Sequence, residues 1–169
     1  ADLAGLILPE ATARRTTLAR NPDAFMAWAN LGDTLAQQGR HHEAILAFRR
    51  GLQLRPDDAP VHNDLGCALV AIRESEAAIP ILERALQLRP GFGEVHNNLG
   101  NAFSRVGRGD DAIRHYEEAI RLKPAHFEAL DNLGCELVLK GRLPEAIARF
   151  EEAIRLSPDS VKYRRDLGT

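Results

Sequence analysis

The chain has 169 residues, of which 44% are hydrophobic and 27% are charged, and its formal net charge is −2. This balance is typical of a folded globular chain and argues against disorder. The weak net charge and an aromatic content of 5% argue against a nucleic-acid-binding surface, which needs excess lysine and arginine with stacking aromatics. The sequence contains no run of 18 apolar residues, so it predicts no membrane-spanning helix. Two cysteines are too few for a disulfide-stapled domain.

A spacing of 34 residues organises the chain. The markers are prolines and glycines: Pro22, Pro56, Pro90, Pro124 and Pro158, and Gly32, Gly66, Gly100, Gly134 and Gly168. Several coincident markers at one period indicate a repeat architecture, in which each unit buries its apolar face by stacking on its neighbours. We therefore expect complete repeats at 25–58, 59–92, 93–126 and 127–160.

Each repeat is predicted to contain two helices, as the first one illustrates. Its first helix covers about 27–37, with Trp28, Leu31 and Leu35 on one face. Gly39 marks the turn, and the second helix places Ala44 and its later neighbours on one face until the proline at the end of the unit stops it. Before this repeat, we expect 1–24 to be a degenerate repeat or an N-terminal capping helix.

The second repeat departs from the pattern. Arg73 stands where the other three units have glycine at the turn, and Pro80 lies inside the expected second helix. Because proline removes a backbone donor, we expect a local bend there. The last segment, 161–169, stops partway through a further first helix and is expected to be a truncated fifth repeat or a C-terminal cap.

These markers closely resemble the tetratricopeptide repeat family. Trp28, Leu31, Gly32, Ala44 and Phe48 occupy the family's positions, followed by the unit-ending proline. The resemblance implies an all-α, right-handed superhelical solenoid of helix-turn-helix units. Small residues such as Gly32 and Ala44 should let the paired helices approach closely, with Phe48 filling the space beside them.

The sequence carries no recognisable catalytic motif. It has no phosphate-binding loop, no nucleophile elbow and no zinc-protease motif. The cysteines Cys67 and Cys135 occupy the same position two repeats apart, too far for a disulfide. We therefore expect a non-enzymatic chain with no cofactor and no metal site.

In the family, the first helices line a concave groove. The resemblance to asparagine ladders of bacterial O-linked N-acetylglucosamine transferase-like arrays makes the amides here candidates for binding an extended peptide backbone. The alternative is that they cap local backbone. The candidate groove residues are Asn30, Asp33, Asn63, Asp64, Asn97, Asn98, Asn101, Asp131, Asn132, Val138 and Leu139. The last two belong to an apolar band that either holds partner side chains or packs between repeats.

Acidic side chains in this groove favour a neutral to basic protein or peptide partner, with no nucleic acid and no membrane. The sequence thus predicts a protein–protein interaction scaffold, of bacterial type, in the cytoplasm or alternatively the periplasm. Two other functions stay open. The chain could be the substrate-recognition arm of a larger enzyme such as a glycosyltransferase, or a tetratricopeptide oligomer that self-assembles through its terminal repeats.

Overall fold

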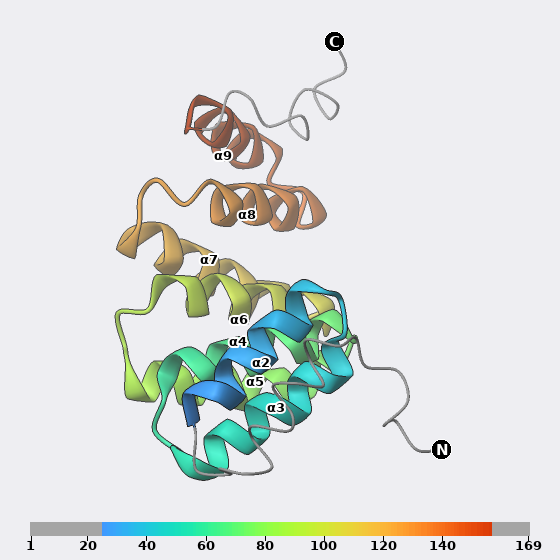
Figure 1. The fold of residues 1–169 in the computed structure, drawn as a ribbon. Coiled ribbons are helices and arrows are strands. Elements are labelled where there is room, and N and C mark those ends of the chain that lie inside the picture. The colour runs from blue at the N-terminus through green and yellow to red at the C-terminus, as the bar shows by residue number, and fades with distance from the viewer. Residues whose placement is uncertain (1–24, 157–169) are drawn as a thin grey trace.

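The computed structural model describes residues 25–156, and within them it contains eight α-helices and no strand (Figure 1). The helices are α2 (Phe25–Gln37), α3 (His41–Leu54), α4 (Ala59–Ala71), α5 (Ser75–Leu88), α6 (Gly93–Arg105), α7 (Gly109–Leu122), α8 (Phe127–Leu139) and α9 (Leu143–Leu156). The expectations for 1–24 and 161–169 concern residues outside this range. The all-α repeat architecture predicted from the sequence is confirmed.

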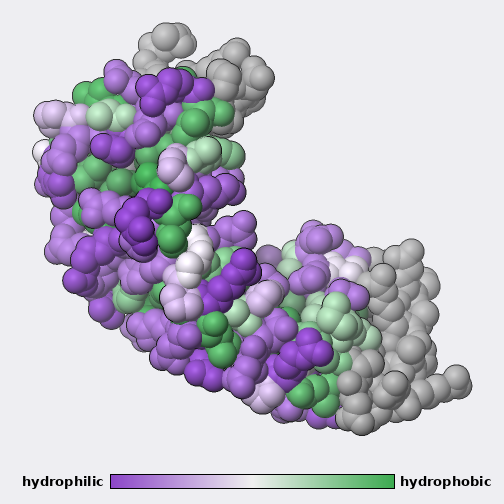
Figure 2. Space-filling view, turned by 90° about the vertical axis from the view of Figure 1, so that its left-hand side faces the viewer, coloured by the Kyte–Doolittle hydropathy of each residue, from purple (hydrophilic) through white to green (hydrophobic). Residues whose placement is uncertain are grey.

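Consecutive helices pack as hairpins that stack along one direction. The pairs α2–α3, α4–α5, α6–α7 and α8–α9 form the repeats, and each second helix also contacts the first helix of the next pair. The described repeats form an arc whose surface is hollowed on one side (Figure 2). Each repeat therefore depends on its neighbours to bury its apolar face, which is how solenoids are stabilised.

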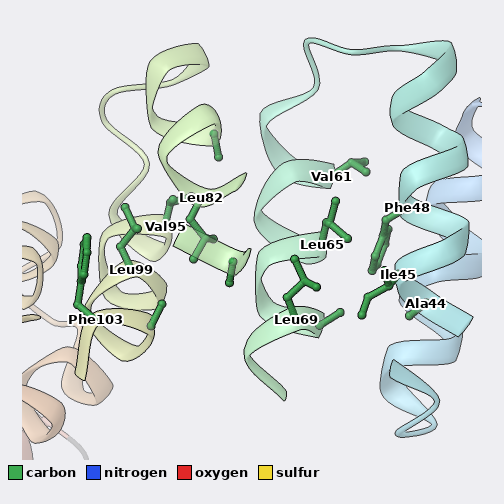
Figure 3. Close-up of a cluster of buried hydrophobic side chains, with 14 of the residues drawn as sticks. Ala44, Ile45, Phe48, Val61, Leu65, Leu69, Leu82, Val95, Leu99 and Phe103 are labelled. Carbon is green, nitrogen blue, oxygen red and sulfur yellow. The ribbon is translucent and has the colours of Figure 1, made fainter. Parts of the chain in front are cut away.

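Glycine and alanine set the close approach within each hairpin. A Cβ atom at Gly32 would lie 2.3 Å from Cε1 of Phe48, and one at Gly66 would lie 2.4 Å from Cδ2 of Leu82. Ala44, on the same seam, is completely buried. The predicted role of these small residues is therefore confirmed, and the side chains beside them join a core that continues from one repeat into the next (Figure 3).

The turns inside the hairpins need a left-handed backbone residue. Gly39, Gly107 and Gly141 adopt φ values of 74°, 76° and 74°, and Arg73 is held at φ 68° in the second repeat. A non-glycine residue in this region carries a steric cost of roughly 1–2 kcal/mol. Helix α5 continues through Pro80, and the bend expected there stays a prediction.

Candidate functional site: the face of the first helices

The first helices α2, α4, α6 and α8 form one continuous face. Each of them contacts the next first helix, and these contacts are closer than those between successive second helices. In a curved stack, the helices that approach one another most closely lie on the inner side of the curve. The face of the first helices is therefore the groove that the sequence predicts as the binding surface, and we call it the groove.

Amide side chains connect the helices along this groove. Nδ2 of Asn98 on α6 donates to Oδ1 of Asn63 on α4 at 2.8 Å. One repeat further, Nδ2 of Asn132 on α8 donates to Oδ1 of Asn97 at 3.1 Å and to Oδ1 of Asn101 at 3.0 Å. The amides are therefore partly occupied in holding neighbouring repeats in register.

The structure separates the predicted groove residues into two groups. Asn63 and Asn97 are each only 8% exposed and Asp131 is 3% exposed, so these three lie between helices and do not face a ligand directly. The sequence pattern placed them in the groove because they adjoin its amide positions. One residue along a helix turns the side chain by about 100°, and here that turn points it at the neighbouring repeat.

The remaining candidates are accessible to different degrees. Asn30 and Asp33 on α2 are exposed, and Val138 and Leu139 on α8 are 44% and 78% exposed. The half-buried members are Asp64, Asn98, Asn101 and Asn132. A partner in the groove would therefore meet carboxylates on the early repeats and an apolar end of α8 on the last described one.

The structure also shows a cavity that the sequence did not predict. It has a volume of about 210 Å³ and lies where α2, α3 and α4 meet. Its lining residues are Asp33, Ala36, Gln37, His41, Phe48, Asp64, Cys67 and Ala68. We call this space the α2–α4 cavity. The sequence predicted only that His41 lies in a turn. The spacing of the lining residues along the sequence does not indicate that their side chains enclose a cavity.

The two carboxylates of the α2–α4 cavity are held in an unfavourable environment for charge. Burial raises the pKa of Asp64 to about 6, and the negative charges of Asp33, Asp58 and Glu94 add to this effect. A hydrogen bond from Nδ2 of Asn63, at 3.2 Å, opposes the rise in the pKa of Asp64 only in part. Burial also raises the pKa of Asp33.

These carboxylates lack the partners that acidic residues have elsewhere. Outside the groove, carboxylates pair with arginines three residues away, as in Arg40–Glu43 at 2.7 Å and Arg142–Glu145 at 2.6 Å. Within residues 25–156, neither Asp33 nor Asp64 forms an ion pair. The groove therefore holds negative charge that the described part of the chain does not neutralise.

Other buried polar contacts serve the packing of repeats. Glu136 on α8 is 6% exposed and accepts a hydrogen bond from Oγ of Ser104 on α6, a contact that the residue pattern does not predict. Within residues 25–156, neither Cys67 nor Cys135 forms a disulfide. Among the described residues, no group of three metal-ligating side chains gathers, and none of the helices is long and apolar enough to cross a membrane.

Family models match most of the chain. Three tetratricopeptide repeat models match residues 11–59, 59–92 and 92–159. Together with the stacked hairpins and the glycine–aromatic seams, these matches show that the chain belongs to the tetratricopeptide repeat family. A comparison with curated proteins finds no match.

Solved structures share the fold over nearly the whole chain. A crystal structure of MamA is 29% identical with a TM-score of 0.81, covering 90% of this chain and 90% of that one. MamA from Desulfovibrio magneticus RS-1 is 21% identical with a TM-score of 0.75, covering 91% and 98%. YrrB, described as a tetratricopeptide protein with an unusual peptide-binding site, is 18% identical with a TM-score of 0.60, covering 94% and 100%. At these last two identities the likeness concerns the fold alone.

Proposed function

We propose that this protein-interaction scaffold binds an extended, neutral to basic segment of a partner protein in its groove. The single observation that carries the proposal is the uncompensated negative charge of Asp33 and Asp64 on the face formed by the first helices. Complementary charge favours encounter with a partner segment and selects against an acidic one. YrrB, which shares this fold, is described as having an unusual peptide-binding site, so a protein of this fold can bind a peptide.

The far end of the groove offers apolar contacts. Leu139 is 78% exposed at the end of α8, beside the exposed Val138 and one turn after the exposed Cys135. Exposed large aliphatic side chains next to polar ones are typical of interaction surfaces. We propose that Val138 and Leu139 hold apolar side chains of the partner segment, while Asn30, Asn98, Asn101 and Asn132 contact its backbone.

The test begins with a peptide library displayed on phage and selected against the full chain. The selected peptides are then measured by fluorescence polarisation against the chain, a Val138→Ser/Leu139→Ser variant, and a Leu46→Ser control. Leu46 is 56% exposed on α3, outside the face of the first helices, so the control removes a comparable apolar side chain. We expect the double variant to bind at least tenfold more weakly, about 1.4 kcal/mol, and the control to bind normally.

Melting of both variants should stay close to that of the original chain, because surface substitutions usually change stability by less than about 0.5 kcal/mol. Unchanged affinity together with a large fall in melting temperature would show that Val138 and Leu139 pack between repeats. If the double variant binds the selected peptides like the original chain, Val138 and Leu139 are not part of the binding surface.

We infer that binding is the whole activity of the described repeats, with no catalysis, cofactor or nucleic acid, and that the chain acts in the cytoplasm. The comparisons give no support to the alternative of an enzyme's recognition arm. An antibody raised against this chain, used on a denaturing blot of source cells, tests that alternative. A band far above 18.6 kDa would revive it.

A second candidate function is self-association through a terminal repeat. Ile147 on α9 is 57% exposed, whereas its counterparts Ile45 and Ile113 are 5% and 6% exposed and Ile79 is half-buried, on second helices that each contact the next repeat. Leu143 on the same helix is 54% exposed. We propose that a second copy covers this face. Light scattering over a concentration range should show a rising mass, and a constant monomer mass would dismiss the idea.

A further inference from the structure

We propose that the α2–α4 cavity is a receptor for one arginine side chain of the bound segment. The inference rests on the proposed function and adds to it the residue type that the first two repeats select. It begins from the shape of the cavity, which is large enough, at about 210 Å³, to receive several heavy atoms of a guest side chain. Its position between two first helices makes it accessible from the groove.

The walls of the α2–α4 cavity suit the aliphatic part of an arginine. Ala36, Ala68 and Phe48 contribute apolar lining from three different helices. Burial and the neighbouring Asp64 raise the pKa of Cys67 to about 12, so its thiol is neutral at physiological pH. Long cationic side chains bury their methylene stems against such surfaces while their charged heads reach polar groups.

The charged groups of the α2–α4 cavity suit the guanidinium head. Asp33 and Asp64 come from α2 and α4, and neither forms an ion pair within residues 25–156. A guest cation would replace their mutual repulsion by attraction. A guanidinium presents five N–H donors in a planar fork and can therefore serve two carboxylates from different helices at once, which a lysine ammonium does less well.

A buried histidine side chain at the cavity provides independent evidence that a polar partner is lacking there. His41 lines the cavity, and its buried Nδ1 atom has no hydrogen-bond partner among residues 25–156. Buried polar atoms in folded proteins are normally satisfied by protein, water or ligand. The cavity therefore has unused hydrogen-bonding capacity on α3 as well as on α2 and α4.

The repeat pattern explains why the carboxylate at 64 is available. Its counterparts each donate an amide hydrogen bond to the preceding repeat: Asn98 to Asn63, and Asn132 to Asn97. The matching position in the first repeat is Ala29, which offers no side-chain acceptor. An amide at 64 would therefore have no such link to form, and the carboxylate there is free to face the cavity.

The test uses the full chain and four pentapeptides, acetyl-Ala-Ser-Xaa-Ser-Ala-amide, with arginine, lysine, citrulline or norleucine at Xaa. Citrulline keeps the shape of arginine without its charge, and norleucine keeps only an apolar stem. Backbone amide shifts of Ala36, Gln37, Cys67 and Ala68 report binding at the cavity by NMR. We expect the arginine peptide to bind at least tenfold more tightly than the citrulline peptide, with lysine between them.

A double variant and a control variant decide whether this preference comes from the two carboxylates. Asp33→Asn with Asp64→Asn should bring the arginine and citrulline peptides to equal affinity. Asparagine at 64 is already the residue of the next two repeats, so the variant is expected to fold. Glu151→Gln, which removes one carboxylate charge from an exposed site on α9, should keep the preference.

The outcomes separate the inference from the proposed function. If all four peptides shift the backbone amide signals of groove residues and bind with equal affinity, the groove binds peptides and the proposed preference for arginine is wrong. If the arginine peptide shifts only residues away from the cavity, the receptor is likewise wrong. If the library-selected peptides also leave every groove amide unmoved, the proposed function itself fails.

Discussion

Replacing Asp64 by asparagine should stabilise the protein at neutral pH, because its carboxylate is charged at a cost. The pKa of Asp64 is raised from 3.8 to about 6 in the folded chain, chiefly by burial and then by Asp33. At about 1.4 kcal/mol for each tenfold change in proton affinity, this corresponds to roughly 3 kcal/mol. Solvent reaches part of this half-buried group and screens the charges, so we expect a gain of about 1–2 kcal/mol.

The pH dependence of this gain follows from its cause. Between about pH 4 and 6 the folded chain retains a proton on Asp64 that the unfolded chain has released, so stability falls as pH rises through that window. Well below pH 4 both states are protonated and the penalty disappears. The difference between Asp64→Asn and the original chain should therefore be small at pH 4 and complete at pH 7.5.

Urea denaturation and thermal melting of both proteins across this pH range measure the difference, in which the titration of groups distant from Asp64 cancels. A gain of 1–2 kcal/mol would appear as roughly 2–8 °C in melting temperature for a chain of this size. Glu151→Gln, on the exposed surface of α9, is the control and should give little change at either pH. A difference that stays constant from pH 4 to 7.5, or a destabilised Asp64→Asn variant at pH 7.5, would refute the reasoning.

Two further predictions concern the contacts that hold the repeats together. Gly100→Ala should destabilise the protein by about 1–3 kcal/mol in urea denaturation, because its Cβ would lie 2.4 Å from Cε1 of Tyr116. The control Gly91→Ala should be nearly neutral, because a Cβ there meets nothing within 4 Å. Asn132→Ala should cost about 1–3 kcal/mol, since it leaves the buried Oδ1 of Asn97 without its donor, and the exposed Asn30→Ala is its control. Equal melting temperatures within either pair would contradict the corresponding contact.

The fold could be predicted from the sequence because its determinants are local and repeated. The spacing of Gly32 and Phe48 encodes a close helix approach, and Gly39 encodes a left-handed turn. The same requirements recur in each unit, so a departure such as Arg73 shows clearly against the pattern. The structure keeps the left-handed turn there, at φ 68°, which indicates that packing of the flanking helices outweighs the local steric cost.

The candidate site was predicted less completely because its geometry depends on contacts between repeats. The sequence identifies which residues lie on the first helices, but not how far each helix is rotated toward its neighbour. Asn63 and Asn97 consequently look like ligand contacts in the sequence and are buried links in the structure. The α2–α4 cavity, enclosed by residues such as Asp33 and Phe48 from separate helices, leaves no trace in the order of residues.

The links between repeats also connect stability with recognition. Where an asparagine of one repeat meets an asparagine of the next, as in Asn98 with Asn63, the pair holds two helices together and hides part of each amide. Between the first two repeats Ala29 takes the place of one partner, and the other position carries Asp64, whose charge destabilises the folded chain. Asp64 destabilises the folded chain, and its internal contact is a hydrogen bond from Asn63. Such a residue is expected at a site where binding of a ligand offsets the loss of stability. The Asp64→Asn variant therefore offers a combined measurement. A gain in stability together with a loss of arginine preference would locate the recognition site at the junction of the first two described repeats, where Ala29 and Asp64 replace the asparagine pair.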